Sequence, residues 1–165
     1  MRDRPRIDGC EDASGLRLAI VMSAYHAPVT EGLRDGALAA LARASAEPGR
    51  EVPVITVPGA FELPLAARRA AESGAFDALV CLGCVVRGET PHFDYIASAV
   101  AHGIMSASQE TGVPITFGVL TTNTLEEALA RARDGSSNKG WEAAMAAVQF
   151  ANTLRALPGA GGVAG

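Results

Sequence analysis

The sequence predicts an α/β fold in which helices cover both faces of a four-stranded parallel sheet. Four short apolar segments, at residues 16–22, 52–57, 78–86 and 115–120, alternate with segments whose apolar residues recur at helical spacing. Strands that alternate with helices favour a parallel sheet joined by right-handed crossovers. Of the 165 residues, 48% are hydrophobic and 19% are charged, a composition that fits one folded domain.

The two ends of the chain differ from the rest. Residues 1–15 are polar and contain Pro5 and Gly9, so we expect a flexible arm ahead of a single domain at 16–157. Residues 158–165 are rich in glycine and alanine, and we expect a disordered tail. Between them, the expected elements are a strand at 16–22, a helix from Thr30, a strand at 52–57, a helix at 64–73, a strand at 78–86, a helix from His92, a strand at 115–120, a helix from Thr124 and a last helix at 139–157.

In the first half, the apolar run at 16–22 fits a strand that is buried on both faces of the sheet. Residues 23–28 break this run, and apolar residues then recur at helical spacing from Leu33 to Ala44. The segment 52–57 is rich in β-branched residues, which favour strands. Pro64 fits the first turn of the next helix, where its missing N–H group is not needed.

In the second half, the apolar segment 78–86 ends in a polar turn, and the helix from His92 carries an apolar stripe. Thr124 and Glu127 have the spacing of a capping box, which marks a helix start. The last helix, at 139–157, is apolar on nearly all sides. Such a helix buries more than one face, so we expect a subunit interface there.

The charge and composition exclude several classes of protein. The net charge of −4 gives no basic surface for nucleic acid. The longest apolar stretches fall short of the roughly 20 residues that span a bilayer, and the N-terminus lacks the apolar segment of a signal peptide. An odd number of cysteines, 3, makes no disulfide framework. We therefore expect a cytoplasmic protein that binds neither nucleic acid nor membrane.

Polar segments directly follow the first three strands of the expected sheet. They are Tyr25-His26, residues 59–62 and residues 87–92. In such sheets, ligands bind beyond the carboxyl ends of the strands, so the three segments are expected to converge there. The sequence therefore predicts a binding site at this edge, with His26 at its rim.

The third of these segments has the features of an anion site. Gly83, Gly88 and Thr90 have the spacing of a phosphate-binding P-loop, but Glu89 stands where that loop has lysine, which argues against a nucleoside triphosphate. Backbone N–H groups at the following helix start favour a single phosphate. His92 at that start is placed to transfer protons near neutral pH. The alternative is an ordinary polar turn with a solvated histidine.

Three other features allow more than one interpretation. Cys81 and Cys84 are spaced like a redox pair, but residues three apart on a strand point to opposite faces, so neither a disulfide nor a shared metal site is expected. Phe117 lies inside a strand, and its pattern alone predicts a core residue. Arg131, Arg133 and Lys139 cluster around a helix break, where they form either a solvated charged loop or a cationic clamp on a phosphate.

Four segments together resemble the 6,7-dimethyl-8-ribityllumazine synthase family. They are Val57-Pro-Gly-Ala-Phe-Glu-Leu-Pro64, Leu82-Gly-Cys-Val-Val-Arg-Gly-Glu-Thr-Pro-His-Phe-Asp-Tyr95, Gly118-Val-Leu-Thr-Thr122 and Asn138-Lys-Gly-Trp-Glu-Ala-Ala144. The resemblance runs from about Gly15 to Leu157. It implies a flavodoxin-like three-layer α/β/α sandwich that assembles as a homopentamer or a pentamer-based icosahedral shell, with sites between neighbouring subunits.

The activity that the resemblance implies is that of a transferase. Family members join 5-amino-6-(D-ribitylamino)uracil to 3,4-dihydroxy-2-butanone 4-phosphate with loss of phosphate and water, which is the penultimate step of riboflavin biosynthesis. No metal or organic cofactor is implied, and riboflavin synthase is a candidate partner. Two alternatives are a catalytically weak family member that binds flavin or lumazine or forms a shell, and a monomeric flavodoxin-like module that binds FMN.

The family motifs also imply roles for individual residues. Those implied to hold the ribitylaminouracil are Tyr25, Ala60, Phe61, Glu62, Cys84, Val85, Val86 and Phe117. Those implied to hold the phosphate are Glu89, Thr90 and Arg131, with Lys139 as a further candidate. His92 is the implied general acid and base. Phe117 and Arg131 are implied to come from the neighbouring subunit, which moves Phe117 from the core into a site.

The chain departs from the family pattern at three places. Tyr25 stands where phenylalanine or tryptophan is more usual, and Cys84 replaces a threonine or valine, so that only its backbone contacts carry over. Residues 133–137 differ from the usual glycine- and lysine-containing linker. This linker is as short as in shell-forming members, whereas the arm containing Pro5 argues against a shell, so the sequence leaves pentamer and shell as alternatives.

Overall fold

A computed structural model describes residues 4–159 of the chain. Its centre is a four-stranded parallel sheet with the strand order β2-β1-β3-β4. The strands are β1 (Leu18–Ser23), β2 (Val54–Val57), β3 (Ala78–Val86) and β4 (Ile115–Thr122). The helices are α1 (Ala27–Ala44), the 3-10 turn η1 (Ala60–Glu62), α2 (Leu63–Glu72), α3 (His92–Thr111), α4 (Leu125–Arg131) and α5 (Lys139–Ala156).

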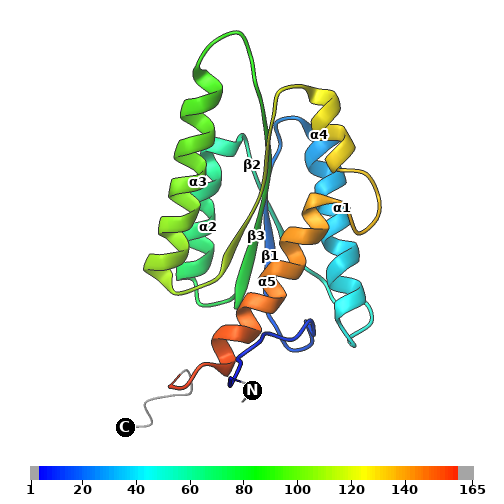
Figure 1. Cartoon of the computed structure of the whole chain (residues 1–165), viewed down its shortest axis with the longest axis vertical. Coiled ribbons are helices and arrows are strands. Elements are labelled where there is room, and N and C mark those ends of the chain that lie inside the picture. The colour runs from blue at the N-terminus through cyan, green and yellow to red at the C-terminus, as the bar shows by residue number, and fades with distance from the viewer. Residues whose placement is uncertain (1–3, 160–165) are drawn as a thin grey trace.

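Helices cover both faces of the sheet. Figure 1 shows α2 and α3 on one face and α1, α4 and α5 on the other. Each face has its own apolar core: Leu33 and Val148 belong to one, and Leu63 and Val100 to the other. All of β1 is buried, as its apolar run predicts. The predicted three-layer α/β/α sandwich with a four-stranded parallel sheet is confirmed.

Most element boundaries lie close to those expected. β3 spans the residues expected for it, and the helix predicted from His92 begins at that residue. The helix predicted from Thr30 begins three residues earlier, at Ala27. Pro28 lies in its first turn, where a missing N–H group does no harm, so the break that follows β1 ends before this proline rather than after it. The fourth strand continues beyond the predicted end at residue 120 to Thr122.

Two local predictions about side chains are also confirmed. Cys81 and Cys84 belong to the apolar cores on opposite faces of the sheet, and both are free thiols. Thr124 caps α4, because its hydroxyl oxygen accepts a hydrogen bond of 3.1 Å from the Glu127 N–H group. The Glu127 carboxylate in turn accepts a bond of 3.0 Å from the N–H group of Asn123.

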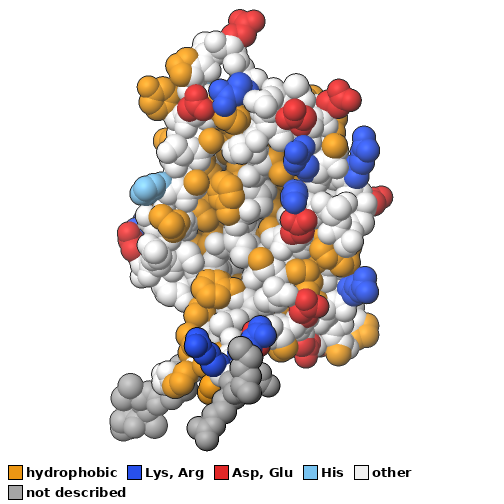
Figure 2. Space-filling view, in the orientation of Figure 1, with side chains coloured by type: hydrophobic (Ala, Val, Ile, Leu, Met, Phe, Trp, Pro, Cys, Tyr) orange, Lys and Arg blue, Asp and Glu red, His pale blue; other side chains and the backbone are white. Residues whose placement is uncertain are grey.

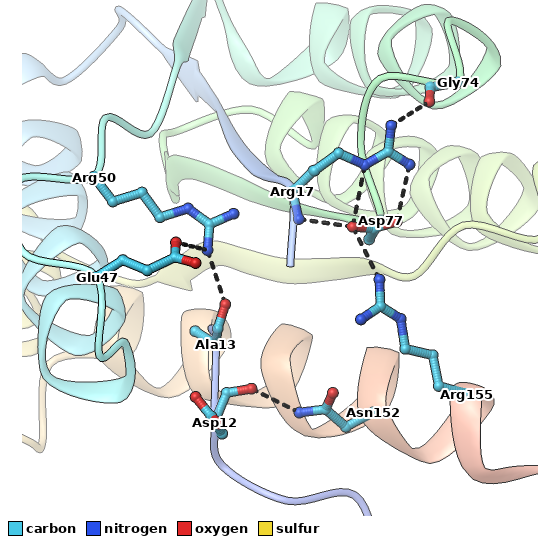
Figure 3. Close-up of polar contacts among 9 residues, drawn as sticks. All are labelled: Asp12, Ala13, Arg17, Glu47, Arg50, Gly74, Asp77, Asn152 and Arg155. Carbon is cyan, nitrogen blue, oxygen red and sulfur yellow. Dashed lines mark hydrogen bonds and ion pairs between the residues drawn. The ribbon is translucent and has the colours of Figure 1, made fainter. Parts of the chain in front are cut away.

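Asp77 joins three elements at the amino ends of the strands (Figure 3). Its carboxylate accepts bonds of 2.7 and 3.0 Å from the backbone N–H and Nη2 of Arg17, and Nη2 of Arg155 at the end of α5 lies 3.2 Å away. Burial alone raises the pKa of Asp77. The hydrogen bonds and charge of Arg17, with the charge of Arg155, outweigh this effect, so the pKa lies below its ordinary value.

The described part of the arm contacts α5 beside this cluster. Asn152 donates bonds of 2.9 Å to the backbone carbonyls of Cys10 and Asp12, the second of which is drawn in Figure 3. The flexibility of the arm stays a prediction, and its residues 1–3 lie outside the described residues, as do residues 160–165 of the tail predicted to be disordered. Across residues 4–159, no helix combines the length and the hydropathy needed to cross a membrane.

Candidate functional site

A cavity of about 580 Å³ lies where β1, β2 and β3 end. Each of these strands leads directly into a segment that lines the cavity, as the convergence of polar segments predicts. The lining residues are Tyr25, His26, Gly59, Ala60, Phe61, Cys84, Val85, Val86, Gly88, Thr90, His92, Phe93 and Ile96. Eight of the residues predicted for the site therefore share one cavity.

The proton-transferring and anion-binding groups of the cavity come from one helix start. His92 is the first residue of α3, and Thr90 precedes it by two positions in a loop that is exposed. The first backbone N–H groups of a helix attract anions because they lie at the positive end of its dipole. The cavity therefore places an imidazole and a hydroxyl beside a favourable position for a phosphate.

Two aromatic rings lie at the opening of the cavity. The side chains of Tyr25 and Phe61 are 67% and 61% exposed, which is unusual for rings of this size. The ring of His26 packs edge-on against Tyr25, with 4.5 Å between the ring centroids. Exposed rings at the rim of an apolar cavity favour a planar ligand, which they can stack against.

His26 is the residue that the sequence placed only at the rim. It is the sole non-glycine residue within 4–159 with a positive φ, of 58°, and it forms the N-cap of α1 without a side-chain capping bond. Its position directly after β1 was the signal for a site residue. Gly59 and Gly88 belong to polar segments expected at this edge, whereas Phe93 and Ile96 complete the lining without having been predicted for it.

Cys84 contributes a neutral group to the cavity wall. Its side chain is buried, and burial raises the pKa of the thiol to about 11. The thiolate is the nucleophilic form of cysteine, so a thiol that stays protonated near neutral pH does not act as a nucleophile. The predicted residues Glu62 and Glu89 are exposed and do not line the cavity, although their neighbours do.

Arg87 holds the loop that carries Thr90, and sequence reasoning gave it no role. Its guanidinium lies over the ring of Phe93 at 4.5 Å and donates a bond of 3.1 Å to Oδ1 of Asn123. It also approaches Asp94 in the first turn of α3 at 3.5 Å. Arg87 thus joins the end of β3 to the start of α3 and to the loop after β4.

Three of the predicted site residues lie elsewhere. Phe117, Arg131 and Lys139 line a separate hollow of about 490 Å³ between β4, α4 and α5. Arg131 donates a bond of 2.9 Å to the carbonyl of Glu127, and Lys139 forms an ion pair of 2.9 Å with Glu142. Because α4 and α5 cover the opposite face of the sheet from α3 (Figure 1), a single chain does not bring Arg131 and Lys139 to His92.

The prediction from pattern alone that Phe117 is a core residue is wrong. β4 is one of the two edge strands of the sheet, and Phe117 is 45% exposed. Together with Met105 and Phe150, which are 50% and 47% exposed, it lines a groove of about 550 Å³ between α3, β4 and α5, which we call the β4 groove. Figure 2 shows hydrophobic side chains along the centre of this face. Exposed apolar surfaces of this kind are typical of protein interaction sites and of ligand-binding grooves.

Size alone does not identify the functional cavity. A larger hollow, of about 710 Å³, lies beside the α1–β2 connection at residues 45–53 and contains none of the predicted site residues. Among residues 4–159, no three histidine, cysteine or acidic side chains gather in a group that could hold a metal ion.

The chain is similar to known proteins of one family. The model of the 6,7-dimethyl-8-ribityllumazine synthase family matches residues 15–155. A curated protein of that name from Syntrophus aciditrophicus (strain SB) is 50% identical over 145 residues, which cover 88% of this chain and 94% of the relative. The chain belongs to the lumazine synthase family.

Membership of the lumazine synthase family confirms the function predicted from the four motifs. The chain is an enzyme of riboflavin biosynthesis, a transferase that acts on small molecules. Neither comparison favours the alternative of a catalytically weak flavin-binding or shell-forming protein.

Proposed function

We propose that the chain condenses 5-amino-6-(D-ribitylamino)uracil with 3,4-dihydroxy-2-butanone 4-phosphate in the cavity where β1, β2 and β3 end. The observation that carries this proposal is the meeting of two exposed rings, a helix start and a histidine around one cavity. Tyr25 and Phe61 offer faces for the pyrimidine ring, and Thr90 and the helix start offer donors for the phosphate. His92 lines the same cavity as these rings and donors, and it is the group that transfers protons.

The remaining residues fall into two sets. In the proposal, the ribitylaminouracil contacts the segment that contains Ala60 and Glu62 and the backbone of residues 84–86, while Phe117 of a second copy closes over its ring. The phosphate contacts Thr90 and the N–H group of Glu89, with Arg131 of the second copy as its main cation and Lys139 beside it. Arginine suits this position because its planar fork donates two parallel bonds to a phosphate.

His92 serves three steps in the proposed sequence. The uracil amine adds to the ketone carbonyl, and the imidazole gives a proton to the resulting hydroxyl, which leaves as water when the imine forms. The imidazole then takes up a proton from carbon as the phosphate leaves with its electron pair, and the enol that results returns to a ketone. In ring closure, the ribitylamino nitrogen attacks this carbonyl, and the imidazole again gives a proton to the hydroxyl that leaves as water. A group with a pKa near neutrality performs such transfers most effectively.

The proposed site needs two copies of the chain. His92 belongs to the helix layer on one face of the sheet and Arg131 to the layer on the other (Figure 1), and the β4 groove offers an apolar surface for a neighbour. We therefore propose a homopentamer with sites between subunits, located in the cytoplasm, with riboflavin synthase as a candidate partner. A sixty-subunit icosahedral shell built from such pentamers is the other assembly that the short linker at 133–137 supports.

Incubation with both substrates tests the proposal, because lumazine is fluorescent. His92→Ala should lower kcat by about 10²- to 10⁴-fold with an unchanged far-ultraviolet circular dichroism spectrum. Arg131→Ala should raise the KM for the phosphate substrate by about 10- to 100-fold, since it removes a charged hydrogen bond. Arg69→Ala, an arginine of α2 that is 78% exposed, is the matched control. Absence of product together with tight flavin binding would refute the proposed reaction.

A further inference from the structure

Asn138, which lies between α4 and α5, uses every hydrogen-bonding position of its side-chain amide. Its side chain is 1% exposed. Oδ1 accepts bonds from the N–H groups of Gly140 at 2.7 Å and Trp141 at 3.2 Å, which cap the start of α5. Nδ2 donates bonds of 3.0 Å to the carbonyls of Gly32 in α1 and of Arg133 in the linker. One residue thus fixes a helix start and ties the linker to a neighbouring helix.

Three glycines let the linker and α5 lie directly against α1. A Cβ atom on Gly36 would collide with the Asn138 amide, one on Gly140 with the carbonyl of Leu33, and one on Gly32 would lie 2.6 Å from the carbonyl of Ala132. None of these glycines has a positive φ, so close approach rather than backbone freedom is what requires them. The linker therefore has little space in which to shift.

This arrangement determines where two cations lie. Arg131 and Lys139 stand at the two ends of the linker and line the same hollow beside β4. Their side chains bond within their own helices, Arg131 to the carbonyl of Glu127 and Lys139 to Glu142. Such contacts set the side chains relative to their helices, whereas the separation of the two helix ends depends on the linker that Asn138 holds.

We propose that Asn138 is a positioning residue that sets the spacing of Arg131 and Lys139 for the phosphate of the substrate. The inference rests on the proposed function, in which these cations reach the phosphate from a neighbouring copy. Misplacement by about 1 Å of a group that binds substrate weakens its contribution strongly. The two Nδ2 bonds therefore act on affinity for the phosphate substrate rather than on the chemistry at His92.

Two substitutions separate the capping role of Asn138 from the positioning role. Asn138→Asp keeps an oxygen that caps α5, where a negative charge is favourable, but offers no donor to the carbonyls of Gly32 and Arg133. Asn138→Ser also keeps a capping oxygen, without a charge, and its single short hydroxyl cannot replace the two Nδ2 bonds to these carbonyls. Asn152→Asp is the matched control, because the Asn152 amide also donates to two backbone carbonyls, those of Cys10 and Asp12, at the other end of the molecule.

Steady-state kinetics with both substrates gives the readout. In Asn138→Asp and Asn138→Ser, the KM for the phosphate substrate should rise about tenfold, and inhibition by inorganic phosphate should weaken by a similar factor. The KM for the ribitylaminouracil and kcat should stay within about twofold of wild type, since the cavity around His92 is unchanged. Asn152→Asp should leave all four quantities unchanged.

Arg131→Ala, measured in parallel, separates this inference from the proposed function. If Arg131→Ala raises the KM for the phosphate substrate and neither Asn138 variant does, Asn138 is a capping residue only and the positioning role is overturned. If Arg131→Ala has no effect, the phosphate assignment itself fails and the inference fails with it. A lowered melting temperature in the Asn138 variants, with an unchanged KM for the phosphate substrate, also overturns the inference. If Asn138→Asp does not fold, the KM of Asn138→Ser decides between the two roles.

Discussion

Replacing Phe150 by aspartate should weaken the association of copies through the β4 groove and reduce activity with it. Phe150 lies on α5, is 47% exposed and lines the groove beside Met105 and Leu154. It lines neither the cavity of His92 nor the hollow of Arg131. A loss of activity in this variant therefore reports on assembly rather than on a substrate contact.

The magnitude follows from the area that a neighbour would cover. A phenylalanine side chain buries about 200 Å² when fully buried, so its exposed 47% amounts to about 95 Å². At about 25 cal/mol per Å², covering this area contributes about 2.4 kcal/mol. Loss of this contribution raises the dissociation constant of each interface about 50-fold, and burial of the aspartate charge adds a desolvation cost.

Light scattering and activity measured over the same dilution series form the assay. On dilution, the variant should lose particle mass and specific activity at a concentration about 50-fold higher than the concentration at which wild type does. It should regain both when concentrated again. Leu129→Asp, on α4 outside the groove and 39% exposed, is the control and should behave as wild type. A dissociated Phe150 variant with full activity would contradict a site shared between copies. An unchanged particle would show that the groove is not the interface.

Three further predictions concern stability and reactivity. Asp77→Asn should lower the unfolding free energy by about 1–3 kcal/mol near neutral pH. Because folding lowers the pKa of Asp77, wild type should lose this stabilisation as the pH falls below about 4, whereas the asparagine variant, which has no carboxyl group there, should not. Urea unfolding at several pH values measures the difference. Cys84, with a pKa raised to about 11, should react slowly with iodoacetamide at pH 8 and faster toward pH 11, and rapid labelling at pH 8 in peptide mapping would contradict this. His26→Gly should be more stable to heat than His26→Ala by about 1 kcal/mol, because glycine adopts a φ of 58° without the strain that histidine and alanine both bear.

The sequence was most informative where local chemistry and the fold agree. The segment 78–86 is apolar throughout and ends in a polar turn, so its limits as a strand could be read directly. His92 follows that turn and opens an amphipathic pattern, which predicted its place at a helix start. The rule that ligands bind where parallel strands end then brought Tyr25 and Phe61 to the same cavity. Pro28 misled because a proline fits both a break and a first turn.

Other features depend on neighbours that the sequence does not reveal. Phe117 lies beside Gly118 and Val119 in a mostly apolar segment that fits a core strand. Only the strand order shows that β4 is an edge strand. The role of Asn138 depends on contacts with Gly32, which is 106 residues away in the chain. From the sequence, that segment was a break between charged residues, and no local pattern indicates its attachment to α1.

The two edges of the sheet differ in a way that bears on assembly. β2 is a short edge strand between Pro53 and Pro58, and prolines at its ends protect an exposed edge from pairing with other chains. β4 has 8 residues from Ile115 to Thr122, without a charge or a proline, and carries the exposed Phe117. An unprotected apolar edge favours aggregation unless a partner covers it. A second copy that covers β4 would remove this hazard and would place the hollow of Arg131 beside a neighbouring chain, so in the proposed assembly the same surface would serve both stability and the chemistry.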